Sequence, residues 1–341
     1  MAAINRLAYL DKDHSFAVRE EPIPQPGNQE LCVKIMANGI CGSDIHFFRD
    51  GRLGNFVVTD PYVPGHEASG RVFSLGAGVN RYAVGDSVVV EPGIPCGRCR
   101  VCRSGRYNLC GSVRFLSAPP ENGTFCDYLV IRADSVHPMP VGVTYEQGAM
   151  AEPAAVAVHA VNRGRVQNGD TGVIVGCGPI GLMVLQAFLA AGGSRAFCID
   201  SATRRLALAA RLGAHETLTP GDLSGTDSCK GDVVFETAGS SQATEGLFAL
   251  ARPGGRVVQV GWPETNRVNL DIAGFIEKEL EYVAVNRYAN AFQTALSWIG
   301  NGRIRTEELV STRYVLQDIG DAFKHAFEHR DEVVKVMVLN E

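Results

Sequence analysis

The chain has 341 residues, more than one hydrophobic core usually spans, so its length predicts about two domains. Apolar residues make up 45% of it and charged residues 20%, and its 38 glycines indicate many tight turns and close backbone approaches. The net charge is -5, and no cluster of Lys and Arg occurs. Because nucleic-acid affinity depends on neutralising phosphates, this composition excludes DNA and RNA as expected partners.

No segment reaches the roughly 18 apolar residues that cross a bilayer, and the first residues lack the apolar stretch of a secretory signal. We therefore expect a cytoplasmic protein without a membrane partner. The ten cysteines then become informative. In a reducing compartment, a cysteine cluster is more often a metal site or a reactive thiol than a set of disulfides.

The first part of the chain, up to about residue 150, is rich in Val, Gly and Pro. Short alternating runs at 31–35, 70–74 and 86–90 are separated by turn residues. Alternation of this kind, broken by Gly and Pro, is typical of short strands with one buried face. We expect a β-rich domain here.

From about residue 167 the pattern changes to short apolar strands that alternate with helical periods. The predicted strands are 172–175, 196–200, 232–236 and 255–260, and the predicted helices are 179–191, 202–212 and 241–251. Regular alternation of strand and helix predicts a parallel, doubly wound sheet. The chain is therefore expected to be an α/β protein with a β-rich domain before the parallel sheet.

The tail after about residue 287 has two helical patterns and a last predicted strand at 332–339. We expect this tail to return to the first domain. The predicted domains are thus residues 1–153 completed by 288–341, and residues 154–287.

Gly176, Gly178 and Gly181 form a G-x-G-x-x-G pattern between a predicted strand and a predicted helix. The first glycine permits a tight turn, and the second lets backbone N–H groups approach a pyrophosphate at the helix N-terminus. The third lets helix and strand pack closely. The pattern predicts a dinucleotide site; a glycine-rich turn without a ligand is the simpler alternative.

Asp200 ends the next predicted strand. A carboxylate there accepts hydrogen bonds from the adenosine ribose hydroxyls and repels a 2′-phosphate, so it favours NAD over NADP. Arg204 and Arg205 lie close enough in sequence to lend some tolerance to the phosphate.

Four cysteines, Cys96, Cys99, Cys102 and Cys110, fall within one short segment rich in Gly and Arg. Zn²⁺ takes four thiolates in a closed tetrahedral site that leaves no position for chemistry, so we predict a structural zinc. Disulfides or merely packed cysteines are the alternative, and a nucleic-acid zinc finger would need a basic surface that this chain lacks.

A second set of potential metal ligands consists of Cys41, His66 and Glu67. A catalytic zinc has about three protein ligands of Cys, His or carboxylate type and one open position. Each of these residues taken singly is more often a packed side chain than a ligand.

The segment 65–70 (GHEASG), followed by Gly76, Val79 and 84–88 (VGDSV), is similar to the signature of zinc-containing medium-chain alcohol dehydrogenases. With the glycine pattern and the four cysteines, the resemblance covers essentially the whole chain. It implies a GroES-like catalytic domain, a Rossmann domain that binds NAD, and two zinc ions, one catalytic and one structural.

Many members of this family take a third zinc ligand from a cysteine near position 152, where this chain has Glu152. That difference resembles the sorbitol (polyol) dehydrogenase branch, as do the segments 51–56, 118–123 and 286–288. Phe47 stands where that branch commonly has a tyrosine that contacts the polyol. The four cysteines resemble the microbial polyol and threonine dehydrogenases rather than the animal enzymes.

The resemblance implies oxidation of a secondary alcohol of a polyol, similar to sorbitol or xylitol, to the ketose. Cys41 and His66 would bind the catalytic zinc, with Glu67, Glu152 or water completing the ligand set. Ser43 and His46 would relay the proton, and Glu152 would act in the zinc shell. The remaining expected contacts are Phe47, Phe115, Glu152, Arg287 and Tyr288 with the substrate, and Gly176, Gly178, Pro179, Ile180, Gly181, Asp200, Arg205, Val260 and Arg287 with the cofactor.

Two alternatives stay open at this point. The substrate could be a cyclitol, an aminocyclitol or an amino alcohol such as threonine. The chain could also be a nucleotide-binding or structural relative without activity, which would predict broken zinc ligands. The apolar segment 280–285 could be an edge strand that pairs across a two-fold axis, so we expect a homodimer or homotetramer.

Overall fold

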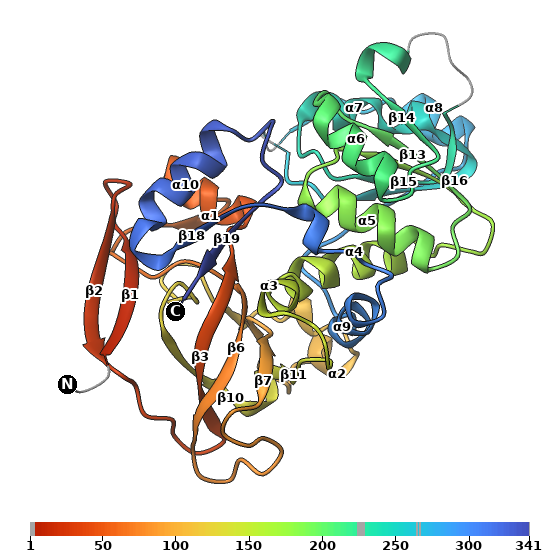
Figure 1. Cartoon of the computed structure of the whole chain (residues 1–341). Helices are drawn as coiled ribbons and strands as arrows, with labels where there is room; N and C mark the ends of the chain where they lie inside the picture. The colour runs from red at the N-terminus through yellow and green to blue at the C-terminus, as the bar shows by residue number, and fades with distance from the viewer. Residues whose placement is uncertain (1–3, 224–228, 264, 266, 341) are drawn as a thin grey trace. The chain divides into compact units, whose positions relative to one another are not determined.

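The computed structural model of the protein describes residues 4–223, 229–263, 265 and 267–340 (Figure 1). The chain forms two compact units, one from Met1–Glu152 with Leu309–Glu341 and the other from Pro153–Glu308. Residues 288–308, which the sequence suggested for the first domain, belong to the second unit. Their helix α9 (Phe292–Gly300) buries an apolar face there, and the Arg305 N–H donates to Gln186 Oε1 at 2.7 Å.

The first unit is built on a sheet of seven strands in the order β11-β7-β6-β3-β19-β18, with β10 also paired to β3. The strands are β3 (Glu30–Gly39), β6 (Glu67–Leu75), β7 (Ser87–Val90), β10 (Tyr128–Arg132), β11 (Val136–Pro138), β18 (Val310–Val315) and β19 (Lys335–Leu339). Strand β19 pairs antiparallel with β3, so the C-terminal segment is part of this sheet (Figure 1).

Smaller elements complete the first unit. The remaining strands are β1 (Ile4–Leu10), β2 (Phe16–Pro22), β4 (Arg52–Leu53), β5 (Phe56–Val57), β8 (Gly93–Ile94) and β9 (Arg114–Phe115). The helices are α1 (Gly42–Asp50), α2 (Arg100–Arg103), α3 (Tyr145–Ala149), the start of α4 (Ala151–Gly164) and α10 (Ile319–Glu328). Helix α10 buries Phe323 in one apolar cluster with Val336 and Val338 of β19, which anchors the returning tail.

The second unit contains a six-stranded parallel sheet in the order β14-β13-β12-β15-β16-β17. Its strands are β12 (Thr171–Val175), β13 (Arg195–Ile199), β14 (Glu216–Leu218), β15 (Gly231–Glu236), β16 (Ala251–Gln259) and β17 (Glu281–Ala284). The helices besides α4 and α9 are α5 (Pro179–Ala190), α6 (Thr203–Arg211), α7 (Ser241–Leu250) and α8 (Ile272–Glu277). The strand order reverses between β12 and β15, which is where doubly wound sheets bind ligands.

The predicted architecture, a β-rich part followed by a doubly wound parallel sheet, is confirmed. Two details near the C-terminus differ. Strand β18 was not predicted, and β19 begins at Lys335 rather than at residue 332. Residues 331–334 instead form a turn, in which the N–H groups of Glu332 and Val333 both donate to the carbonyl of His329.

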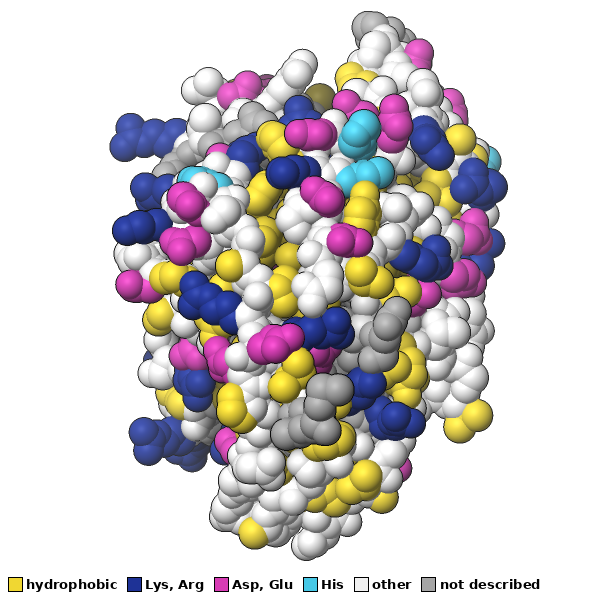
Figure 2. Space-filling view, turned by 60° about the vertical axis from the view of Figure 1, so that its left-hand side comes forward, with side chains coloured by type: hydrophobic (Ala, Val, Ile, Leu, Met, Phe, Trp, Pro, Cys, Tyr) yellow, Lys and Arg dark blue, Asp and Glu magenta, His cyan; other side chains and the backbone are white. Residues whose placement is uncertain are grey.

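Among the described residues, no helix has both the length and the apolar character required to pass through a bilayer. On the face drawn in Figure 2, Lys and Arg side chains are interspersed with Asp and Glu rather than gathered into one basic area.

Candidate functional site

Cys41, His66 and Glu67 come together because β3 and β6 are neighbours. Gly39 at the end of β3 pairs with Glu67 at the start of β6. Cys41 follows β3 as the N-cap of α1, and His66 directly precedes β6. Ligand atoms of Cys41, His66 and Glu67 all lie within 4.8 Å of one another, close enough to share one metal ion.

The Glu67 carboxylate is held by a lysine that the sequence analysis did not select. Lys335, the first residue of β19, donates to Glu67 Oε1 at 2.8 Å and Oε2 at 2.7 Å, and to the Ile40 carbonyl at 3.0 Å. Both charged side chains are almost fully buried. A Cβ on Gly39 would lie 2.1 Å from Glu67 Oε2, so only glycine leaves room for this carboxylate. The ion pair ties the C-terminal strand to the candidate metal site.

His66 is oriented by a second buried acid, Asp44. Asp44 Oδ1 lies 3.4 Å from His66 Nδ1, which leaves Nε2 as the nitrogen for a metal. The Asp44 carboxylate also accepts from Ser117 Oγ at 2.6 Å and from the Cys41 N–H at 3.1 Å. Burial by itself would raise the pKa of Asp44, but His66 and these hydrogen bonds hold it below its usual range. A carboxylate behind a histidine is the usual partner of a metal ligand.

Glu152 is the third acid of this region and lies in the first turn of α4. It is 5% exposed, and burial raises its pKa to about 7. Among the described residues we find no hydrogen bond to its carboxylate, although the charges of His66 and Lys335 act on it. Glu152 is not within the 4.8 Å group, so it would reach a metal through a water molecule or after a side-chain movement. A buried carboxylate without donors fits a place beside a cation.

Metal affinity at this cluster should fall with acidification. Burial would lower the pKa of His66, but Asp44 and Cys41 outweigh it and raise this pKa well above its ordinary value before a metal is bound. A metal must then displace a proton, so affinity should drop about tenfold per pH unit for each proton displaced. Zinc competition with a chromogenic chelator between about pH 6 and 8.5 measures this slope. An affinity that does not change with pH would contradict it.

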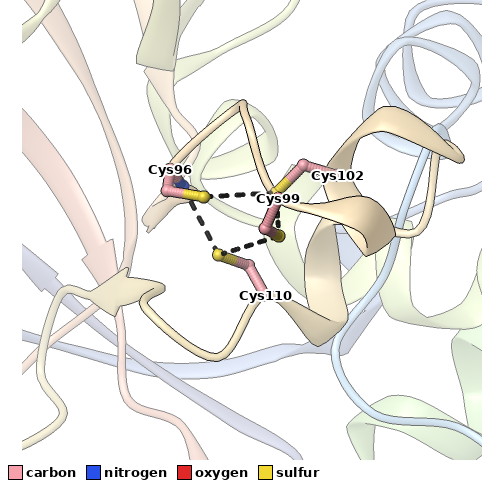
Figure 3. A group of neighbouring side chains, drawn as sticks. All are labelled: Cys96, Cys99, Cys102 and Cys110. Atoms are coloured by element: carbon pink, nitrogen blue, oxygen red, sulfur yellow. Dashed lines mark hydrogen bonds between the residues drawn. The ribbon is translucent and has the colours of Figure 1, made fainter.

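The four cysteines of the second cluster converge from a loop and two short helical turns (Figure 3). Cys99 caps α2, Cys102 lies within it, and Cys110 follows a 3₁₀ turn at Tyr107–Leu109. Their Sγ atoms are 3.4 Å (Cys99 and Cys102), 3.9 Å (Cys99 and Cys110) and 4.0 Å (Cys96 and Cys102) apart. Four thiolates at about 2.3 Å from one ion lie about 3.8 Å apart, whereas a disulfide needs about 2.0 Å.

Without a cation, the thiols of this cluster differ widely in pKa. Backbone N–H groups of Arg98 and Cys99 lower the pKa of Cys96 to about 6. Desolvation and the neighbouring thiols raise the pKa of Cys102 to about 12. Four adjacent thiolates repel one another unless a cation compensates their charge. The spacing and this electrostatic demand both fit a zinc ion.

The glycine pattern lies between β12 and α5. Gly176 has φ +95°, and a Cβ there would lie 2.6 Å from the Ala238 nitrogen. A Cβ on Gly181 would lie 1.8 Å from the Gly176 carbonyl oxygen, so the helix packs directly on the turn. Gly178 is the N-cap of α5 and faces open space, with Pro179 and Ile180 as the first helical residues. Open space at a helix N-terminus fits an anionic pyrophosphate.

Asp200 follows β13 and faces this turn. Its Oδ2 accepts the Cys177 N–H at 2.6 Å, its Oδ1 accepts the Ala202 N–H at 2.8 Å, and Arg205 lies 3.9 Å away. Because a carboxylate has about four acceptor positions, it can still accept two ribose hydroxyls.

The other predicted residues of the first unit differ in surroundings. Ser43 lies in the first turn of α1, partly buried, and His46 is 42% exposed with Nδ1 3.1 Å from Asp50 Oδ2. The Phe115 ring centroid lies 5.4 Å from that of His66. Phe47 instead packs in an apolar cluster against Tyr62, where it is 5% exposed. This packing favours a structural role for Phe47.

In the second unit, Val260 follows β16 and donates its N–H to the Glu236 carbonyl. Arg287 has a positive φ of 54°, and Tyr288 is buried with its ring 5.8 Å from that of Phe292. Asp44, Ser117, Lys335 and Glu236 were not among the predicted site residues. Asp44 lies three residues after Cys41, and Ser117 directly precedes the segment 118–123, so both are near quoted motifs. Lys335 and Glu236 are far from the metal-ligand motifs in sequence.

Family models match both parts of the chain. The "Alcohol dehydrogenase GroES-like domain" matches residues 27–141, and the "Zinc-binding dehydrogenase" model matches residues 179–301. The chain therefore belongs to the zinc-binding dehydrogenases that carry a GroES-like domain. Its expected place in the sorbitol dehydrogenase-like branch of this family is confirmed by the relatives that follow.

The chain is 36% identical to the sorbitol dehydrogenase of Bacillus subtilis strain 168 over 340 residues, covering 98% of this chain and 96% of the relative. The L-idonate 5-dehydrogenase of Escherichia coli K-12 superposes with a TM-score of 0.92 at 30% identity over 99% of both chains. A protein of Sinorhizobium meliloti 1021, solved bound to NADP, superposes with a TM-score of 0.90 at 28% identity, also over 99% of both chains.

Proposed function

We propose that this enzyme oxidises a secondary alcohol of a polyol to the ketone, with NAD as hydride acceptor. The observation that carries the proposal is the buried cluster of Cys41, His66 and the acids around them. The open helix N-terminus at Gly178 supports a dinucleotide. The similarity to a sorbitol dehydrogenase over nearly the whole chain supports a polyol substrate.

Cys41 and His66 would hold the catalytic zinc. Of the two candidate acids, Glu67 lies within ligand distance, but both of its oxygens are bonded to Lys335. Glu152 lies outside that distance and would complete the set through a water molecule or after a side-chain movement. When bound, zinc would act as a Lewis acid on the alcohol, and the nicotinamide would accept the hydride. Cys96, Cys99, Cys102 and Cys110 would hold the structural zinc.

The chain itself must orient the alcohol and carry its proton away. The Phe115 ring beside His66 would form an apolar wall of the metal site and limit the access of water. Ser43, two residues after Cys41, would take the proton, and the half-exposed His46 would pass it to solvent. Arg287 and Tyr288 would hydrogen-bond substrate hydroxyls or the cofactor.

A substrate panel tests the proposal. Purified enzyme is supplied with NAD and a polyol (sorbitol or xylitol), a cyclitol, or threonine at about pH 8 to 9, while absorbance of the reduced cofactor is followed. Turnover of the polyols supports the proposal. Turnover of only the cyclitol or threonine would replace the substrate class, and turnover of none would contradict the enzymatic role.

Replacing Asp200 with alanine should shift the cofactor preference. Charged hydrogen bonds to the ribose contribute about 1.5 to 3 kcal/mol, so the KM for NAD should rise about 10- to 100-fold. The KM for NADP should fall, because the repelling carboxylate is gone. The matched control is Asp222→Ala, an exposed acid of the same unit that, among the described residues, bonds Thr219 alone. Wild-type enzyme that prefers NADP would contradict our interpretation of Asp200.

We further propose a homodimer or homotetramer and a cytoplasmic location. Strand β17 is the edge of the parallel sheet, and Tyr282 on it is exposed, as are Ile272 and Ile276 of α8. An uncovered apolar edge favours pairing with a second copy. All ten cysteines are unpaired, which agrees with a reducing compartment. Sedimentation at micromolar concentration tests the assembly, and a monomer would contradict it.

A further inference from the structure

Glu236 is a buried acid of the second unit that has no part in the proposed oxidation or in metal binding. It is the last residue of β15, at the carboxyl edge of the parallel sheet, and its exposure is 0%. Among the described residues, no Lys, Arg or His forms an ion pair with it. Burying a carboxylate without a cation is costly, so its hydrogen bonds must compensate for the lost water.

The Glu236 side chain is satisfied by two loops. Its Oε1 accepts the backbone N–H groups of Ala238 at 3.0 Å and Gly239 at 2.8 Å, in the loop after β15. Its Oε2 accepts the Gln259 side-chain amide at 2.7 Å, from the end of β16. One carboxylate therefore joins the loop after β15 to the loop after β16.

Backbone hydrogen bonds join the same two loops. The Glu236 carbonyl accepts the N–H groups of Val260 at 2.8 Å and Gly261 at 3.0 Å. A Cβ on Gly261 would lie 2.5 Å from both Glu236 Oε2 and the Gly239 nitrogen. The two loops are in contact, and only glycine fits between them.

The loop after β15 also lies against the glycine turn after β12. Thr237 Oγ1 donates to the Gly176 carbonyl at 2.7 Å and lies 3.0 Å from that of Val175. A Cβ on Gly176 would collide with Ala238, as described above. Three successive strand ends, those of β12, β15 and β16, are thus held as one surface with Glu236 behind it.

The strand order decides which half of a dinucleotide meets this surface. Asp200 follows β13, on one side of β12, where the adenosine ribose is expected. Strands β15 and β16 lie on the other side of β12, beyond the switch in strand order. A dinucleotide that crosses the switch point must place its nicotinamide half over the ends of β15 and β16.

We propose that Glu236 is a positioning residue that holds the loops after β15 and β16 in the arrangement needed by the nicotinamide half of the cofactor. The inference rests on the proposed function, in which NAD binds at the glycine turn. Without the carboxylate, the N–H groups of Ala238 and Gly239 lose their acceptor, and the loops must move to reach water.

The test compares a whole dinucleotide with its adenosine half. Dissociation constants are measured for NADH by fluorescence and for AMP by calorimetry, in wild type, Glu236→Ala and Glu236→Gln. In the alanine variant we expect the NADH constant to rise at least about tenfold, while the AMP constant changes less than about twofold. Glutamine keeps one acceptor but turns an NH₂ group toward N–H donors, so an intermediate NADH constant is expected.

Glu245→Gln is the matched control, because this exposed glutamate of α7 lies in the same unit and its side chain bonds Asn269 alone in the described part of the chain. Equal weakening of NADH and AMP, or unchanged NADH binding, would overturn the inference. If the alanine variant does not fold, the glutamine variant, which matches glutamate in size, replaces it. The change in its NADH dissociation constant is then compared with the change in its AMP dissociation constant. Wild-type protein that binds AMP but not NADH would instead contradict the proposed function.

Discussion

Replacing His66 with alanine should lower kcat for polyol oxidation by about a thousandfold or more, because Lewis-acid stabilisation of developing charge contributes several kcal/mol. His66 supplies one of the few ligands at the cluster with Cys41, and its loss leaves at most one soft ligand beside the carboxylates. Initial rates with NAD, together with metal analysis by mass spectrometry, measure the effect. The variant should hold about one zinc ion per chain instead of about two.

The fold of this variant should survive, because His66 does not support the apolar clusters of the first unit. Circular dichroism and NADH binding therefore stay near the wild-type values. The matched control is His137→Ala, which removes a partly buried histidine of the same unit that pairs with Glu91. Substantial polyol turnover by the His66 variant with one ion lost would show that the ion at this cluster is not the catalytic one.

Local patterns in the sequence were sufficient to predict the parallel sheet. Strand β12, the turn at Gly176 and helix α5 follow one another without a gap, and each has its own signal in the residues. The same holds for the four cysteines, whose short spacing leaves the chain little choice but to form a compact lobe. Where the chemistry is local in sequence, one chain is enough to predict it.

Local sequence patterns were not sufficient to predict the residues that surround His66. Lys335 reaches Glu67 from the last strand, and Ser117 reaches Asp44 from the loop between β9 and β10. The sequence does not show which acid either residue meets, because a partner far along the chain becomes a neighbour only through strand pairing. A lysine in an apolar strand indicated a buried partner, since Lys is almost never buried unpaired. Which acid that partner is could not be deduced before β19 was paired with β3.

Replacing Cys99 with serine should remove the other zinc ion and lower stability while leaving the chemistry at His66 intact. Its Sγ lies 3.4 Å from Cys102 and 3.9 Å from Cys110, so its loss opens the closed thiolate set. Metal binding at such a site contributes to folding directly, and losing a few kcal/mol would lower Tm by roughly 10 °C. Differential scanning fluorimetry and metal analysis measure both changes in one preparation.

Loss of the structural zinc and loss of the catalytic zinc should have different effects on activity. Cys126→Ala removes a buried thiol of the same unit that belongs to neither cluster, and it should keep about two ions per chain. Below its melting temperature the Cys99 variant should retain most of the wild-type kcat, because a closed four-thiolate site offers no position for substrate. Should the Cys99 and His66 variants lose activity equally while both stay folded, the division into a structural and a catalytic site would be wrong. The four-cysteine lobe would then have to act on the reaction through the fold.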